Sequence, residues 1–309
     1  MKKDLIWRKI NCKLCGATSE SLLYQIGPYR IVKCKECGFI YLNPQPIVVE
    51  EEIYQEGYFR GAVENPDTIN VNGYDYFCSD RHQKKVDASN YYLDKIERMA
   101  HKGRILDVGC GPGIFLKVAE ERGWDCYGIE VSPFAARYAI DQLGLKVKCS
   151  SLEQADLPKD FFDVVTLFHV IEHLREPLDV MHKVHKILKE EGLLVIETPD
   201  ISSGRARRAK ERWEHIRLPE HLYYYSKRTL VKLLEMTSFR PIKVEKRVGG
   251  TGLMIAACGG QEKAKAFYDV WYKKKWFRIA VDSVRRMKEF ISGTLLGDYD
   301  HITVYARKA

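Results

Sequence analysis

The sequence has no apolar run long enough to cross a bilayer. The longest runs, Leu193–Ile196 and Gly252–Cys258, fall far short of the ~18 residues that a transmembrane helix needs. The amino-terminal Met1-Lys2-Lys3 is followed by alternating polar and apolar residues rather than an apolar segment. We therefore expect no secretory signal and a cytoplasmic protein. Nine cysteines, an odd number, also argue against a framework of disulfides.

The composition is that of a globular protein. The chain has 309 residues, of which 45% are hydrophobic and 30% are charged, and this excludes a fibre or a disordered tail. The formal net charge is +8, but residues 1–200 carry 26 basic and 31 acidic side chains, whereas residues 201–309 carry 24 and 11. The basic excess of the last third suits a phosphorylated small molecule, an anionic membrane or a nucleic acid, or is a solvated surface.

Four of the cysteines form two matching CxxCG pairs. Cys12 and Cys15 precede Gly16, and Cys34 and Cys37 precede Gly38. Each pair places two thiolates on one side of a tight turn, where glycine accepts the backbone geometry. The spacing predicts a zinc ribbon whose short hairpin consists of Leu22–Gln25 and Arg30–Lys33. Four thiolate ligands leave no open position, so the zinc would be structural. Redox dithiols and an iron site with the same ligands are the alternatives.

The other five cysteines are scattered, and we expect ordinary buried thiols at all of them. They are Cys78, Cys110, Cys126, Cys149 and Cys258.

A glycine-rich turn lies in the centre of the chain. A predicted helix over 82–102 ends at Gly103, and Arg104–Gly113 then gives a short apolar strand followed by a GxGxG turn and a helix, Ile114–Arg122. In such a turn the missing Cβ atoms let the backbone approach a cofactor. The strand Asp125–Glu130 ends in an acid, and a carboxylate at this position can accept both hydroxyl protons of a ribose.

Strands and helices alternate over the rest of the chain, which predicts a parallel sheet wound on both faces. The expected helices are Pro133–Leu143 and Ser226–Thr237. The expected strands are Lys146–Cys149, Phe162–Phe168, Gly192–Glu197, Pro241–Arg247 and His301–Ala306.

Four motifs, in order and spacing, resemble the class I S-adenosylmethionine-dependent methyltransferases, in particular the branch with an amino-terminal zinc ribbon that acts on sugars and other small molecules. They are Asp107–Gly113, Glu130, Phe162–Val165 and His169–Leu174. The resemblance implies an α/β fold with a Rossmann-like, doubly wound, seven-stranded sheet whose last strand is antiparallel. It implies a zinc ribbon over 1–45, a linker, flap and lead-in helix over 46–102, and a methyltransferase domain over 103–309 with a helical insertion at 252–297.

The same resemblance implies the residues that bind S-adenosylmethionine. Asp107 would hold the ammonium group and Glu130 the ribose hydroxyls. The family's usual acid after the third strand is absent, so the hydroxyl of Ser151 takes its place beside Leu152. The remaining expected contacts are Gly109, Cys110, Gly111, Gly113, His169 and Val170.

Two loops are expected to carry the chemistry, because ligands bind at the carboxyl ends of the strands in such sheets. If Val170–Leu174 begins a helix, His169, Glu172 and His173 share a face. They would form a general base with its partner, half of a divalent-metal site, or a brace for the loop. His221, in a stretch that resembles the zinc-ribbon branch, is the predicted base that removes the acceptor's proton, or else a residue that pins its loop. Trp213 is expected to line the acceptor pocket.

Two further segments are assigned by pattern. Tyr54, Tyr58 and Phe59 resemble the flap that closes over the cofactor. Glu262–Ser292 carries nine basic and four acidic residues together with seven aromatic side chains. It is expected to be a lid or dimer helix, or a helix in peripheral contact with an anionic membrane.

The predicted function is transfer of a methyl group from S-adenosylmethionine to an oxygen, or less favourably a carbon, of a small, anionic or phosphorylated molecule, such as a nucleotide-linked sugar or a polysaccharide or lipid precursor. The sugar C-methyltransferases of the branch carry a further carboxyl-terminal domain, which we expect this chain to lack, and this favours oxygen over carbon. The alternatives are an RNA methyltransferase, disfavoured because segment 1–45 lacks an aromatic and basic array, and a non-catalytic scaffold that binds the cofactor.

Overall fold

The computed structural model describes residues 6–47, 53–61, 75–247 and 300–309. Cys258 and Glu262–Ser292 lie outside the described residues, so the expectations for them stand as predictions. None of the helices in the described ranges is long and apolar enough to cross a membrane.

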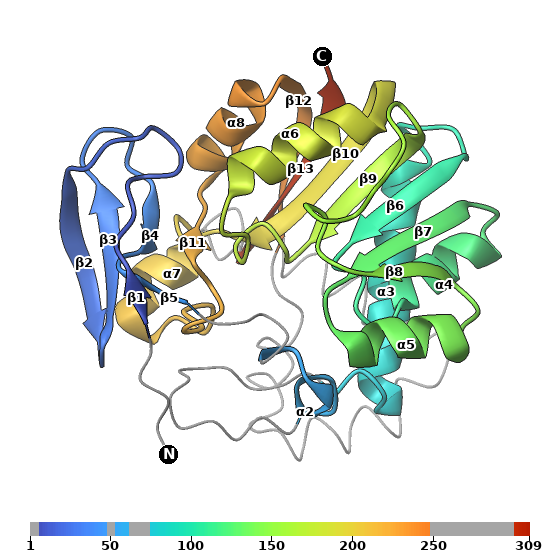
Figure 1. Cartoon of the computed structure of the whole chain (residues 1–309), viewed down its shortest axis with the longest axis horizontal. Coiled ribbons are helices and arrows are strands. Elements are labelled where there is room, and N and C mark those ends of the chain that lie inside the picture. The colour runs from blue at the N-terminus through green and yellow to red at the C-terminus, as the bar shows by residue number, and fades with distance from the viewer. Residues whose placement is uncertain (1–5, 48–52, 62–74, 248–299) are drawn as a thin grey trace.

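The body is a seven-stranded sheet in the order β12-β13-β10-β9-β6-β7-β8 (Figure 1). The pairs β10·β9, β9·β6, β6·β7 and β7·β8 are parallel, whereas β13 is antiparallel to both of its neighbours. This confirms the predicted sheet, including its antiparallel last strand. The bounds are β6 Arg104–Val108, β7 Asp125–Glu130, β8 Lys146–Cys149, β9 Phe162–Phe168, β10 Leu188–Pro199, β12 Phe239–Arg247 and β13 His301–Lys308.

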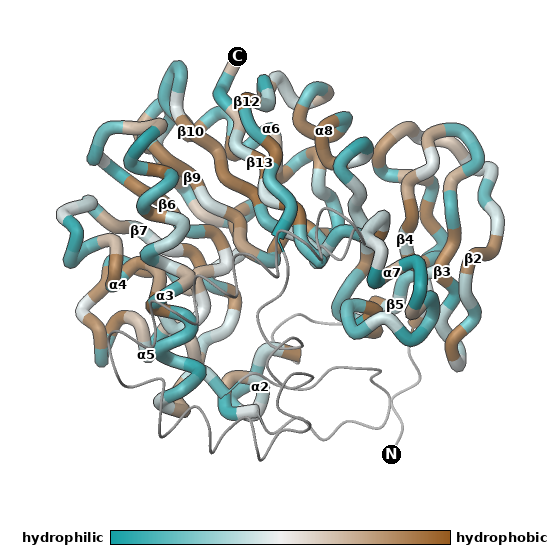
Figure 2. Tube along the Cα trace, turned by 180° about the vertical axis from the view of Figure 1, so that it is seen from behind, coloured by the Kyte–Doolittle hydropathy of each residue, from teal (hydrophilic) through white to brown (hydrophobic). Residues whose placement is uncertain are grey.

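Both faces of the sheet are buried. Successive residues of a strand point to opposite faces, and the central strands carry apolar residues at successive positions. Ile105, Val164 and Leu193 belong to one core cluster, and their neighbours Leu106, Val165 and Leu194 belong to the other. Figure 2 shows hydrophobic residues concentrated along β9 and β10 in the middle of the sheet. Near-continuous apolar strands of this kind require helices on both sides.

Helices cover both faces of the sheet. α3 Ser79–Ile96 and α4 Ile114–Glu121 share the first cluster, and α6 Pro177–Ile187 and α8 Lys227–Met236 share the second. α5 Pro133–Asp141 packs beside β8. α3 ends at Ile96, six residues before the predicted end, and the chain turns there before β6. The short elements α2 Glu56–Phe59, α7 Gly204–Ala209 and η1 Lys210–Arg212 lie in the connections.

The amino-terminal region forms a small sheet of its own. The hairpin of β2 Glu20–Ile26 and β3 Tyr29–Cys34 turns at Gly27-Pro28 and contains both predicted hairpin segments. β4 Ile40–Leu42 adds to β3, and β11 Tyr223–Tyr224 adds to β4 from the distant body of the chain. The short pair β1 Trp7–Arg8 and β5 Gln45–Pro46 lies next to this sheet. β11 therefore joins the amino-terminal sheet to the loop that carries His221.

Candidate active site

The glycine turn after β6 has the geometry of a cofactor cradle. Gly109, Gly111 and Gly113 have φ angles of +70°, +54° and +85°, which side-chain-bearing residues rarely adopt. A Cβ on Gly109 would lie 2.6 Å from Val170 Cγ2, and one on Gly113 would lie 2.6 Å from Leu145 Cδ1. Of the residues that the structure describes, a Cβ on Gly111 would meet only Phe59, at 3.9 Å. The outer two glycines thus allow close packing, and the middle one leaves space above the turn.

Two buried carboxylates flank the turn. Asp107 is 4% exposed and accepts a 2.6 Å hydrogen bond from Thr166 Oγ1. Glu130 accepts hydrogen bonds of 2.8 Å from the backbone N–H of Gly111 and of Ser132. Burial raises the pKa of Glu130, and burial, together with the charge of Glu130, raises the pKa of Asp107 to about 7. Two buried acids in this arrangement favour a ligand that brings positive charge and hydroxyl donors.

The raised pKa of Asp107 predicts a pH-dependent affinity for S-adenosylmethionine. A protonated Asp107 must lose its proton before it pairs with the ligand's ammonium group. Between about pH 7 and pH 5.5 the affinity should therefore fall by up to about tenfold per pH unit. Titration calorimetry across this range measures the effect, and Asp107→Asn is the control because it has no proton to lose. An equal slope in the wild type and in Asp107→Asn would contradict the prediction.

The other predicted cofactor residues surround the same turn. Val170 faces Gly109, and Cys110 is buried. The end of β8 pairs with the end of β7, so that Ser150 N–H donates to Glu130 O at 3.0 Å and brings Ser151 and Leu152 next to Glu130. Leu152 is buried, and Ser151 Oγ accepts from Gln154 N–H at 3.3 Å. The structure thus brings the sequence-predicted residues together at one edge of the sheet.

His169 lies between two acids instead of on a helix. Residues 170–174 form a turn, and α6 begins only at Pro177, so the conditional prediction of a helix at Val170–Leu174 is wrong. His169, with φ +57°, places Nε2 3.2 Å from Glu197 Oε1 and Nδ1 3.5 Å from Glu172 Oε1. Loss of hydration opposes its charge, but Glu172 and Glu197 outweigh this and raise the pKa of His169 to about 9. The ring is therefore charged at neutral pH.

Sequence reasoning missed a group of polar residues beside His169. The His301 ring lies 5.0 Å from the His169 ring and 4.8 Å from that of His215. Glu197 accepts from Thr303 Oγ1 at 2.8 Å and from the hydroxyl of Tyr92. The available signal was an acid directly after the apolar run of a buried strand, at the carboxyl end where ligands bind.

Glu172, His173 and His221 meet in the neighbouring space. Their donor atoms all lie within 4.8 Å of one another, although His221 is 48 residues beyond His173 in the sequence and comes from another loop. The backbone oxygen of Glu172 accepts from the N–H groups of Leu222 and Tyr223, at 2.9 and 3.1 Å, which ties the two loops together. His221 is 3% exposed, and burial, with the charge of His173, lowers its pKa well below the usual range. Its ring is therefore neutral at pH 7.

The predicted flap lies against this site. The Tyr54 hydroxyl is 3.0 Å from His173 Nδ1, and the Tyr54 backbone oxygen accepts from Ser132 Oγ at 2.6 Å. Phe59 is buried and lies nearest to Gly111. Trp213, expected in the pocket wall, is instead 2% exposed within the core.

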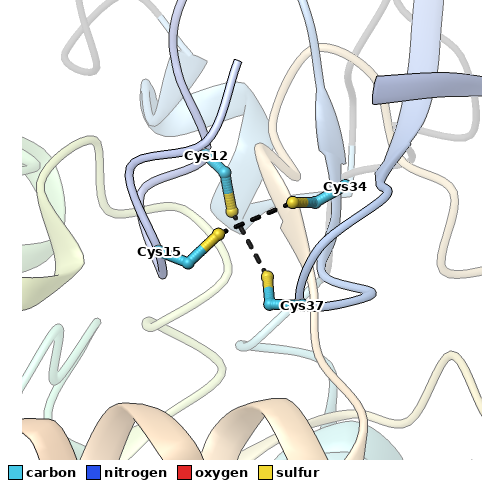
Figure 3. A group of neighbouring side chains, drawn as sticks. All are labelled: Cys12, Cys15, Cys34 and Cys37. Atoms are coloured by element: carbon cyan, nitrogen blue, oxygen red, sulfur yellow. Dashed lines mark hydrogen bonds between the residues drawn. The ribbon is translucent and has the colours of Figure 1, made fainter. Parts of the chain in front are cut away.

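The four cysteines of the two CxxCG pairs form a second centre (Figure 3). The Sγ atoms of Cys12 and Cys37 are 3.5 Å apart, and those of Cys15 and Cys34 are 3.6 Å apart. Four thiolates around one zinc at 2.3 Å are about 3.8 Å apart, so these residues fit the ion. Gly16 and Gly38 have φ angles of +75° and +78°, as the turns require.

Two of the four other cysteines that the structure describes depart from the prediction of buried thiols. Cys110 and Cys126 are buried, but Cys78 and Cys149 are exposed. Both exposed residues stand at element ends, Cys78 before α3 and Cys149 at the end of the edge strand β8. The prediction is therefore wrong for these two positions.

Comparison with known proteins places the central region in one family. Residues 81–244 match the family model described as "Methyltransferase domain". The ubiquinone biosynthesis O-methyltransferase of Pseudomonas syringae is 31% identical over 115 residues, which is 35% of this chain and 48% of that protein. The enzyme of the same name from Cereibacter sphaeroides is 33% identical over 100 residues, which is 31% of this chain and 40% of that protein. The chain thus matches less than half the length of these relatives.

A solved structure shows the same fold. The SAM-dependent methyltransferase from Archaeoglobus fulgidus superposes with a TM-score of 0.52 at 20% identity. The superposition covers 76% of this chain and 100% of that one. The likeness extends beyond the matched family region and supports the sheet order described above.

Proposed function

Because the chain belongs to the methyltransferase-domain family, we propose that it transfers the methyl group of S-adenosylmethionine to a hydroxyl oxygen of a small molecule. The observation that carries the proposal is the pair of buried carboxylates, Asp107 and Glu130, beside the open glycine turn. The relatives named as O-methyltransferases support oxygen as the accepting atom. We further propose that the four clustered cysteines hold a structural zinc.

The chain's own residues suit the binding of the cofactor. Asp107 would pair with the ammonium group of the cofactor and Glu130 with its ribose hydroxyls, while the turn at Gly109–Gly113 would accommodate its amino-acid part. When bound, S-adenosylmethionine supplies an electrophilic methyl group on a positively charged sulfur. Tyr54 and Phe59, which lie over the turn and against His173, would exclude water from the site and hold the acceptor in line.

The cluster of Glu172, His173 and His221 would meet the acceptor hydroxyl. In the reaction a C–O bond forms, the C–S bond breaks, and the hydroxyl proton leaves to a base, so that S-adenosylhomocysteine is the other product. His221 is the proposed base, because its neutral ring has a lone pair to accept the proton. The charged His169, held by Glu172 and Glu197, would position Glu172.

The proposed acceptor class rests on charge. The run after β10, which precedes the loop of His221 in the sequence, carries Arg205, Arg207, Arg208, Lys210 and Arg212. We propose an anionic acceptor, such as a nucleotide-linked sugar or a polysaccharide or lipid precursor. The test is formation of S-adenosylhomocysteine with a panel of phosphorylated sugars, hydroxylated lipids and matched uncharged analogues. The proposal expects turnover with an anionic member and a new methyl ether in the product. A methyl group on carbon, or turnover only with RNA, would contradict it.

A further inference from the structure

The cluster of Glu172, His173 and His221 has the donor set of a cation site. Its donors are one carboxylate oxygen and two imidazole nitrogens, all within 4.8 Å of one another. Donors that share an ion at about 2.1 Å are roughly 3 to 4 Å apart. The turn after β9 offers two of the three donors, Glu172 and His173, and the third, His221, comes from the loop before β11. The fold therefore brings together ligands that are far apart in the sequence.

The hydrogen bonds of each histidine ring leave one ring nitrogen available to bind a cation. His173 Nδ1 lies 3.0 Å from the backbone oxygen of Glu220, and a carbonyl can only accept, so Nδ1 carries the proton and Nε2 keeps its lone pair. The His221 ring is likewise hydrogen-bonded to the backbone of His215. Metal-binding histidines in proteins almost always donate their second ring N–H in this way, which fixes the ring for the ion.

Glu172 offers the third ligand atom. The side chain is 1% exposed, and its Oε2 accepts from Thr198 Oγ1 at 3.0 Å. Among the described residues its Oε1 has no hydrogen-bond partner, and the His169 ring forms an ion pair with it at 3.5 Å. A carboxylate oxygen that is both buried and without a hydrogen bond is costly. A cation at the centre of the cluster would satisfy it.

We propose that Glu172, His173 and His221 bind a divalent cation of the first transition series. Two imidazoles and one carboxylate suit such ions, and three protein ligands leave coordination positions open, unlike the closed set of four thiolates. The inference rests on the proposed function in one respect, that the acceptor hydroxyl meets this cluster. A cation there lowers the pKa of a hydroxyl bound to it. With the cation bound, His221 is a ligand and the proton of the hydroxyl leaves to solvent water. His221 is the base only where no cation is bound.

The test is a Co²⁺ titration of the 309-residue chain after zinc has been loaded onto the four clustered cysteines, followed by visible absorption. We expect one Co²⁺ per chain with a spectrum of nitrogen and oxygen ligands and without sulfur charge-transfer bands. His173→Ala, His221→Ala and Glu172→Gln should each weaken Co²⁺ binding at least about 100-fold. His173 is only partly buried, so its variant is the least disturbed in folding. His182→Ala, an exposed histidine on α6, is the control and should bind as the wild type does.

The titration reads the metal alone, which separates this inference from the proposed function. No Co²⁺ beyond the ribbon, or equal affinity in the wild type and in folded His173→Ala, overturns the cation site. If the same protein binds S-adenosylmethionine, the proposed function survives that result. Conversely, Co²⁺ binding that the three variants abolish supports the cation site even in a protein that binds no S-adenosylmethionine.

Discussion

Replacing Cys34 by alanine should abolish zinc binding and destabilise the whole chain by at least about 3 kcal/mol. Structural zinc contributes on the order of 10 kcal/mol to the folding of small zinc domains, and loss of one of four thiolates removes the closed coordination shell. β3 ends at Cys34 and lies in the middle of the amino-terminal sheet, between β2 and β4. Loss of this zinc ligand therefore affects β3, an inner strand of the amino-terminal sheet.

The effect should extend to the active site. Phe39 stacks on Tyr223 with ring centroids 5.4 Å apart and contacts Tyr225 at 5.1 Å. Leu42 N–H donates to Leu222 O at 2.9 Å, next to His221. When the amino-terminal sheet loosens, the loop that carries His221 loses these contacts. Cys34→Ala should consequently impair the Glu172, His173 and His221 cluster as well as the ribbon.

Metal analysis, denaturant unfolding and the Co²⁺ titration on the same samples measure these effects. Cys78→Ala is the matched control, because Cys78 is an exposed cysteine outside the cluster. It should retain one zinc per chain and the stability of the wild type. A Cys34→Ala protein that keeps both its zinc and its stability would refute the structural role of the cluster.

Replacing Glu130 by alanine should weaken S-adenosylmethionine binding by about 10² to 10⁴-fold. The carboxylate would accept both ribose hydroxyls, and each hydrogen bond to a charged group contributes roughly 1.5–3 kcal/mol. Loss of both costs about 3–6 kcal/mol, which converts to that range of affinity. Equilibrium dialysis with radiolabelled cofactor measures it.

Glu130 also shapes the turn, so the variant needs controls. Its carboxylate accepts hydrogen bonds from the N–H groups of Gly111 and Ser132, and alanine would leave both N–H groups without this partner. Glu130→Gln keeps one acceptor oxygen and should give an intermediate affinity. Glu121→Gln, an exposed acid at the end of α4, should bind as the wild type does. Binding by a folded Glu130→Ala within threefold of the wild type would rule out the assigned role.

The sequence predicted the sheet well because its signals are local. Buried strands such as Phe162–Phe168 are apolar on both faces. Glycines stand directly before and after β6, at Gly103 and Gly109. The strand and helix alternation then leaves few topologies. The candidate cofactor site was predictable for the same reason, since Asp107, the glycines and Glu130 lie at the carboxyl ends of consecutive strands.

The acceptor side depends on contacts between distant residues, and there prediction was weaker. Nothing local indicates that Tyr223 and Tyr224 pair with β4 of the amino-terminal sheet, or that this pairing brings His221 to His173. A helix beginning at Val170–Leu174 is the condition under which His169 and His173 share a face, but α6 begins only at Pro177. Trp213 was assigned to a pocket by residue type, whereas packing places it in the core.

Binding of S-adenosylmethionine is measured by a calorimetric titration of the wild-type protein, with zinc determined on the same sample. We expect one cofactor bound per chain, with micromolar affinity, to a protein that holds one zinc. A folded, zinc-loaded protein that binds no S-adenosylmethionine would rule out the proposed methyl transfer.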